Sequence, residues 1–100
     1  MANWHITQKK EGYMQKELAI NRGFGKKTRG EITISRMTGY AKPRYGVTAK
    51  LFDTKEIGLT KGDEGLIKEH RYRTFVFAKR ATAQRKANAM QREFNKLVRR

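Results

Sequence analysis

The chain has 100 residues, of which 37% are hydrophobic and 10% are aromatic, enough for one domain with a modest core. Lysine and arginine number 24 against nine acidic residues, so the formal net charge is +15 and polyanionic partners are favoured. The absence of cysteine excludes disulfides, thiolate metal sites and nucleophilic thiols. No stretch has the pattern of a signal sequence or of a membrane-spanning helix, and we expect a single domain over residues 1–100 in the cytoplasm.

The N-terminal segment has the alternation that is typical of a strand. Trp4 and Ile6 are separated by polar residues, so we expect both apolar side chains to face inward. Residues 9–12 end in glycine and supply a turn.

Residues 13–21 have an ambiguous pattern. The four-residue step from Met14 to Leu18 favours a helix, whereas Leu18 and Ile20 alternate as they would in a strand. We favour a strand that pairs with the first one, with a helix as the alternative.

Residues 21–30 combine three glycines with four cations around Phe24. Glycine adopts backbone conformations closed to other residues, so we expect a basic loop that faces an anion or water. Residues 25–28 resemble the end of a phosphate-binding loop, but Ile20 stands where that motif requires glycine. A nucleotide-binding loop is therefore not expected.

The middle of the chain predicts a β-hairpin. Ile32 and Ile34 share one face of a strand over residues 31–37, and a second strand over residues 45–51 places Tyr45, Val47, Ala49 and Leu51 on one face. The loop between them contains the one proline of the chain, and we expect it to project as a basic, aromatic finger.

Residues 53–69 reverse the charge of the chain, because five acidic residues outnumber three lysines. We expect turns at the glycines, a short strand over residues 56–59, and no polyanion contact in this region. Carboxylates can hold Mg²⁺ in a nuclease, but a solvated acidic loop is the favoured interpretation. The four carboxylates considered for such a site are Asp53, Asp63, Glu64 and Glu69.

The C-terminal third predicts a strand followed by a long helix. In the strand over residues 70–78, Tyr72, Thr74 and Val76 face one way, and the opposite face holds Arg71, Arg73, Phe75 and Phe77. We expect Phe75 and Phe77 to meet the helix. Residues 81–98 form an amphipathic helix in which Thr82 is the expected N-cap. Its apolar stripe consists of Ala83, Ala87, Met90, Phe94, Leu97 and Val98.

These elements predict an α+β fold, a small antiparallel sheet of three to five strands packed against one long C-terminal helix. Over residues 31–98 the element order resembles the small DNA-binding domains with a three-stranded sheet and one helix, such as the plant AP2 type and the arm-type domains of phage integrases. That resemblance implies DNA binding by analogy of fold.

The positive charges form three clusters that predict nucleic-acid binding, because lysine and arginine neutralise phosphates and aromatic rings stack on exposed bases. His5 and His70 have no metal-ligand spacing, and neither catalysis nor a cofactor is indicated. The candidate contact residues are Arg22, Lys26, Lys27 and Arg29 in the glycine-rich loop; Arg36, Tyr40, Lys42 and Arg44 in the finger; and Arg80, Arg85, Lys86, Arg92, Lys96 and Arg99 on the helix.

The resulting hypothesis is a small non-enzymatic protein that binds DNA or RNA, with a slight preference for double-stranded DNA because of the uninterrupted helix. Such a protein would suit a phage-encoded or chromosomal accessory factor, or a component of a nucleoid or ribonucleoprotein. The alternative is an interaction factor or inhibitor that binds an acidic protein partner, such as a host enzyme or a transcription or defence complex. Carboxylates and phosphates attract the same cations, so the sequence leaves both open.

Overall fold

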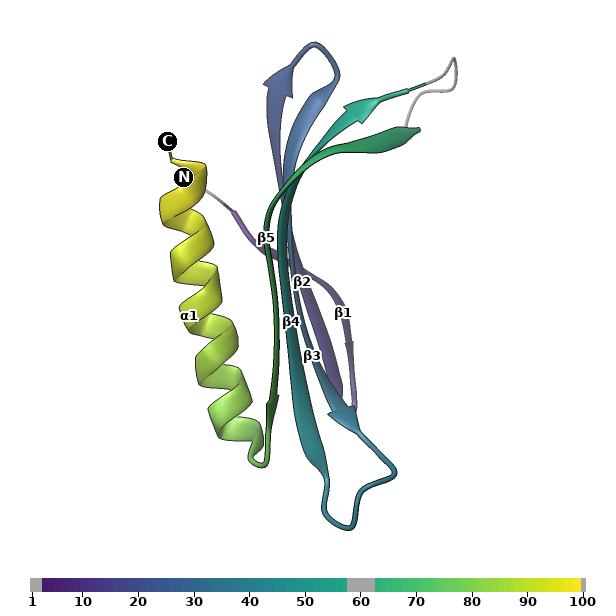
Figure 1. Ribbon diagram of the computed structural model, residues 1–100, viewed down its shortest axis with the longest axis vertical. Coiled ribbons are helices and arrows are strands. Elements are labelled where there is room, and N and C mark those ends of the chain that lie inside the picture. The colour runs from purple at the N-terminus through teal and green to yellow at the C-terminus, as the bar shows by residue number, and fades with distance from the viewer. Residues whose placement is uncertain (1–2, 58–62, 100) are drawn as a thin grey trace.

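A computed structural model describes residues 3–57 and 63–99 of the chain. Five strands precede one helix, and the α+β fold expected from the sequence is confirmed (Figure 1). The elements are β1 (His5–Lys10), β2 (Tyr13–Gly23), β3 (Lys26–Met37), β4 (Arg44–Glu56), β5 (Glu64–Phe77) and α1 (Arg80–Val98).

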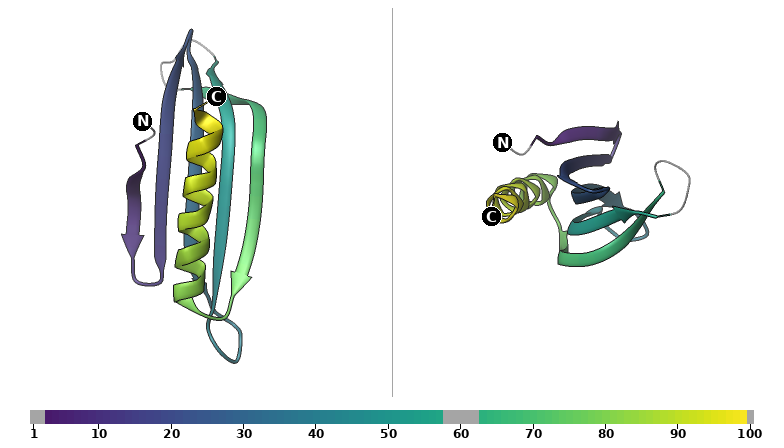
Figure 2. Two further views of the ribbon diagram at one scale, coloured as in Figure 1. Left: turned by 90° about the vertical axis from the view of Figure 1, so that its left-hand side faces the viewer. Right: turned by 90° about the horizontal axis from the view of Figure 1, so that it is seen from above.

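The strands form one sheet in the order β1-β2-β3-β4-β5, and each neighbouring pair is antiparallel. The chain then reverses after β5, and α1 runs back along one face of this sheet (Figure 2). The helix packs on β3, β4 and β5. Within residues 3–57 and 63–99, no helix is both long and apolar enough to cross a membrane.

The core lies between α1 and the sheet face that it covers. Alternate residues of the strands point to opposite faces, so the apolar positions of β2, β3 and β4 come together under the helix. The apolar stripe of the helix meets them as expected, and Phe94 at its centre is fully buried. The buried apolar residues are Leu18, Ile32, Ile34, Val47, Ala49, Leu51, Ala83, Ala87, Met90, Phe94 and Val98.

Trp4, which directly precedes β1, packs against this core. Its ring stacks on Phe94 with the centroids 6.3 Å apart, and its Nε1 donates a hydrogen bond to Oδ1 of Asn95 at 2.7 Å. The ring lies over Gly30, where an added Cβ would stand 2.6 Å from the indole. Glycine at this position therefore leaves the room that Trp4 occupies.

Ile6 lies on the helix side of the sheet, because it pairs with Lys16, whose Nζ donates to Gln91 of α1, but the side chain is 54% exposed and the expected burial is absent. The edge strand β1 lies beyond the strands that α1 covers, and a β-bulge interrupts its pairing with β2 between Ile6 and Gln8. The strand expected over residues 13–21 is confirmed, and so is the orientation of Phe75 and Phe77 toward the core.

Most of the glycine-rich segment is strand rather than loop. β2 continues to Gly23 and β3 begins at Lys26, so the reversal needs only the two residues between them. Gly23 and Gly25 have φ angles of 85° and 75°, which allow this tight turn. The loop prediction was therefore too long.

Other boundaries also differ from the sequence prediction. β4 continues to Glu56, five residues beyond its expected end, and Gly65, where a turn was expected, lies within β5. β5 begins at Glu64, six residues before the expected start, while residues 58 and 59 of the expected short strand lie outside the described residues. The N-cap of α1 is Lys79 instead of Thr82, and no side chain caps the helix. The extended backbone of Lys79 starts the helix early, so that Thr82 already lies in its first turn.

Candidate nucleic-acid interface

The outer side of α1 carries a row of exposed cations. Ala87 and Phe94 point into the core, so residues half a turn away point outward. Together α1 and Arg99 hold six cations and one carboxylate, Glu93. Among residues 3–57 and 63–99, none of these six cations takes part in an ion pair. Arg85, Arg92, Lys96 and Arg99 are exposed on this outer side, whereas Arg80, which is also exposed, lines a small cleft with Met14, Ile34 and Tyr45.

β5 adds two arginines to this side of the molecule. Arg71 and Arg73 alternate with Phe75 and Phe77, so they share the face toward the helix, and both are exposed on this edge strand. Lys86 connects the helix to the strand, because its Nζ lies 4.4 Å from the centre of the Phe75 ring. We call Arg71, Arg73, Arg85, Arg92, Lys96 and Arg99 the helix-side basic surface.

A cavity of about 450 Å³ opens at the C-terminal end of α1. Arg22 and Lys26 from the β2–β3 hairpin line it together with His70 and Arg71 from β5. The hairpin cations and the β5 cations, which are far apart in the sequence, thus meet at one site. Apolar side chains complete the lining, among them Leu51, Ile67 and Leu97.

Arg22 has a structural role in this cavity. Its Nε donates to Oγ1 of Thr28 at 3.0 Å, and its Nη2 donates to the carbonyl oxygen of Val98 at 3.1 Å. The guanidinium therefore binds a carbonyl in the last turn of α1, where cations are favourable. This predicted contact residue holds the helix end against β2.

Asp53 continues the same network. Its Oδ1 accepts a hydrogen bond from Oγ1 of Thr28 at 2.8 Å, and its Oδ2 lies 2.8 Å from Nε2 of His70. Partial burial acts to raise the pKa of Asp53, but the hydrogen bonds from Thr28 and His70 outweigh it and leave this pKa below its usual value. The carboxylate is thus engaged in binding protein groups.

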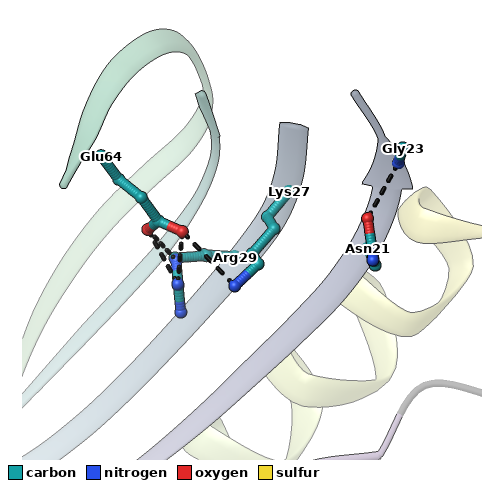
Figure 3. Close-up of polar contacts among 5 residues, drawn as sticks. All are labelled: Asn21, Gly23, Lys27, Arg29 and Glu64. Atoms are coloured by element: carbon teal, nitrogen blue, oxygen red, sulfur yellow. Dashed lines mark hydrogen bonds and ion pairs between the residues drawn. The ribbon is translucent and has the colours of Figure 1, made fainter. Parts of the chain in front are cut away.

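Lys27 and Arg29, two further predicted contact residues, converge on Glu64 (Figure 3). Nε and Nη2 of Arg29 each donate to a different Glu64 oxygen at 2.8 Å, and Nζ of Lys27 lies 3.5 Å from the same carboxylate. The hydrogen bonds from Arg29 lower the pKa of Glu64, and that carboxylate in turn raises the pKa of Arg29. These two cations are therefore already neutralised in part.

The finger of the β3–β4 hairpin lies at the opposite end of the sheet, near the start of α1 (Figure 1). Tyr40 is 52% exposed, and Cζ of Arg44 lies 5.3 Å from the centre of its ring. Arg36, Lys42 and Arg44 are all exposed. The finger and the glycine-rich turn are thus separate clusters at the two ends of a molecule measuring 48 × 28 × 20 Å.

The sheet face opposite α1, which we call the open face, carries both signs of charge. Glu17 and Glu31 are register partners on neighbouring strands, and they alternate with residues of the core. A shallow hollow on this face is lined by two acidic residues and one lysine beside apolar and aromatic groups. Its lining residues are Glu31, Lys50, Phe52, Leu66, Glu69 and Tyr72.

Two aromatic residues beside the predicted cations have different surroundings. Tyr45 packs against the core, whereas Phe24 is 97% exposed at the tip of the β2–β3 hairpin. Arg71 and Arg73 are the contact candidates that the sequence reasoning missed. The alternation in this strand had already placed both on the face of Phe75 and Phe77, and the expected position of that face beside the helix was the signal that could have added them to the candidates.

The acidic residues considered for a metal site are dispersed. Asp53 binds Thr28 and His70, while Glu64 binds Lys27 and Arg29. In the part of the chain that the structure describes, no three His, Asp or Glu side chains are grouped as a metal site requires.

No family model, no curated protein and no solved structure matches this chain. The sheet has five strands, whereas the small DNA-binding domains that the element order resembles have three.

Proposed function

We propose that this protein is a non-enzymatic nucleic-acid-binding protein that contacts phosphates through the helix-side basic surface. The observation that carries the proposal is the row of exposed cations along α1, none of which forms an ion pair among the described residues. A row of such cations along a helix of 19 residues, about 28 Å long, suits the regularly charged backbone of a nucleic acid. The length and rigidity of α1 favour double-stranded DNA slightly over RNA.

Phosphate contact is favoured over reading of base edges. The amide side chains of α1 that could read bases are engaged within the protein, since Gln84 donates to Asn88 at 3.1 Å and Gln91 accepts from Lys16 at 3.3 Å. Asn95 in turn accepts from Trp4. We therefore propose binding with little sequence preference, because direct readout needs side chains that are free to pair with base edges.

The proposal is tested by fluorescence-anisotropy titration of labelled duplex DNA, single-stranded DNA and structured RNA at several salt concentrations. We expect the logarithm of the affinity for duplex DNA to fall linearly with the logarithm of salt concentration. Unrelated sequences of equal length should bind with similar affinity. Negligible binding to all three nucleic acids at low salt would contradict the proposal.

An acidic protein is the second candidate partner. The cavity at the end of α1 favours it, because Leu51, Ile67 and Leu97 lie beside Arg22 and Arg71 there. An acidic peptide with one apolar side chain would match that lining. Saturable binding of one stoichiometric protein partner, together with absent nucleic-acid binding, would support this candidate over the first.

A further inference from the structure

The tip of the β2–β3 hairpin has an unusual backbone. Gly23, Phe24 and Gly25 are consecutive residues with φ angles of 85°, 57° and 75°. Glycine adopts such angles freely, but a bulky side chain in the left-handed region is an outlier that costs conformational energy. Phe24 is the one non-glycine residue with positive φ among the residues described.

This turn is held in place by its neighbours. The backbone nitrogen of Glu56 donates to the carbonyl oxygen of Gly25 at 2.9 Å, which ties the tip to the end of β4. On the other side, Oδ1 of Asn21 accepts a hydrogen bond from the nitrogen of Gly23 at 2.9 Å (Figure 3). Two contacts therefore fix the backbone on either side of Phe24.

The aromatic ring of Phe24 is not buried, although its backbone is fixed on both sides. Phe24 is 97% exposed, the highest value among the exposed large hydrophobic residues of the described chain. Asparagine or glycine would form the same turn with less strain, because both tolerate the left-handed region. The turn does not require phenylalanine, so the ring is suited to a contact outside the chain.

Two lysines lie at the base of the hairpin tip, where Glu56 also approaches Gly25. Lys26 and Lys55 are register partners on β3 and β4 beside the tip, and both are exposed. Lys26 also lines the cavity that contains Arg71, so the tip is continuous with the helix-side basic surface. A nucleic acid bound along that surface would thus reach Phe24 with its phosphates near Lys26 and Lys55.

We propose that Phe24 is a base-stacking wedge, which inserts at an unstacked or deformable step of the nucleic acid while the flanking lysines bind phosphates. This inference rests on the proposed nucleic-acid binding and adds a preference for a structural form of the ligand. Apolar wedges on narrow β-structures part base steps in this way, and the energy for unstacking is smallest where a base is already mismatched or bulged.

The test compares the wild type with Phe24→Asn and Phe24→Trp on two labelled DNA duplexes, one fully paired and one with a single-nucleotide bulge. We expect the wild type and Phe24→Trp to prefer the bulged duplex. Phe24→Asn should bind it about 5- to 100-fold more weakly, the range expected for loss of one stacked ring. Its salt dependence should be unchanged, because no charge is removed.

Thermal unfolding of Phe24→Asn supplies the control for folding, and its midpoint should equal or exceed that of the wild type. Equal affinity and equal bulge preference in the wild type and Phe24→Asn would overturn the proposed role of Phe24 and leave the proposed nucleic-acid binding intact. Failure of the wild type to bind either duplex would overturn both the wedge and the proposed function. Loss of binding to phosphatidylserine vesicles in Phe24→Asn, with unchanged DNA binding, would reassign the ring to a membrane surface.

Discussion

The two faces of the sheet use charge in opposite ways. On the open face, Arg29 and Lys27 bind Glu64, and Glu31 shares a hollow with Lys50. On the helix side, the cations of α1 have no ion-pair partners among residues 3–57 and 63–99. The net charge of +15 therefore does not locate a binding surface by itself. Nor does the lack of an ion pair, because Lys50 of the open face has none among the described residues either. The surface is located where exposed cations without ion pairs follow one another along a single element, α1.

The largest difference between the two faces should appear in stability. Phe94→Ala removes a fully buried ring that stacks on Trp4, so we expect it to lower the free energy of unfolding by about 3–5 kcal/mol. Tyr72→Ala removes an aromatic ring from the open face, where the residue is 49% exposed, and should cost under about 1 kcal/mol. Urea unfolding of both variants measures the difference, and equal losses would show that the open face is packed too.

A second difference concerns pH, because Asp53 lies in the network at the end of α1. Its folded pKa is below the unfolded value of about 3.9, so its stabilising effect is complete above that value. This stabilisation is lost as the pH falls through the folded pKa. We expect Asp53→Asn to reduce stability near pH 6 and to approach the wild type near pH 3, as measured by thermal unfolding at both pH values.

Glu64 also has a lowered pKa and titrates in the same acidic range, so both proteins should lose part of their stability there. The diagnostic quantity is therefore the difference between wild type and Asp53→Asn. A difference that stays constant from pH 6 to pH 3 would contradict the role given to the Asp53 carboxylate.

The smallest effect is expected from Glu64→Gln, which frees Lys27 and Arg29 of their carboxylate partner. Because Arg29 belongs to the open face, whereas Lys27 also lines the cavity at the end of α1, the log–log slope for duplex binding should change by at most about 0.9, the value for one phosphate contact. A slope steeper by nearly 2 would mean that both freed cations contact phosphates. The phosphate-binding surface would then include part of the open face.

Most elements of this fold could be predicted because they follow from a local period. Ile32 and Ile34 alternate along β3, and Ala87 and Phe94 fall on one side of α1, so strand, helix and buried face follow from spacing. The same alternation along β5 places Arg71 and Arg73 on the helix side of the sheet. Local periodicity therefore accounts for the layers and for the exposed cations of α1.

Contacts between distant residues could not be predicted in this way. Arg29 meets Glu64 across 35 positions of the chain, and Trp4 meets Asn95 across 91. The glycine-rich segment was misread because its glycines have different roles: Gly23 and Gly25 form the turn, whereas Gly30 admits the Trp4 ring. Such roles depend on how the sheet and helix meet, which no local pattern contains.

Phosphate binding by the helix-side basic surface can be measured in one salt titration. We would compare the wild type with the triple variant Arg85→Gln, Arg92→Gln and Arg99→Gln on labelled duplex DNA. The matched control is Lys10→Gln with Lys50→Gln, which removes lysines that lie over Tyr13 and Tyr72 on the open face.

These arginines point away from the core, so the triple variant should unfold at nearly the wild-type temperature. Its binding should weaken, and its log–log salt slope should become shallower by about 0.9 for each lost phosphate contact. The control should keep the slope of the wild type. A triple variant with the wild-type slope, or a control that loses as much slope per charge, would contradict the account.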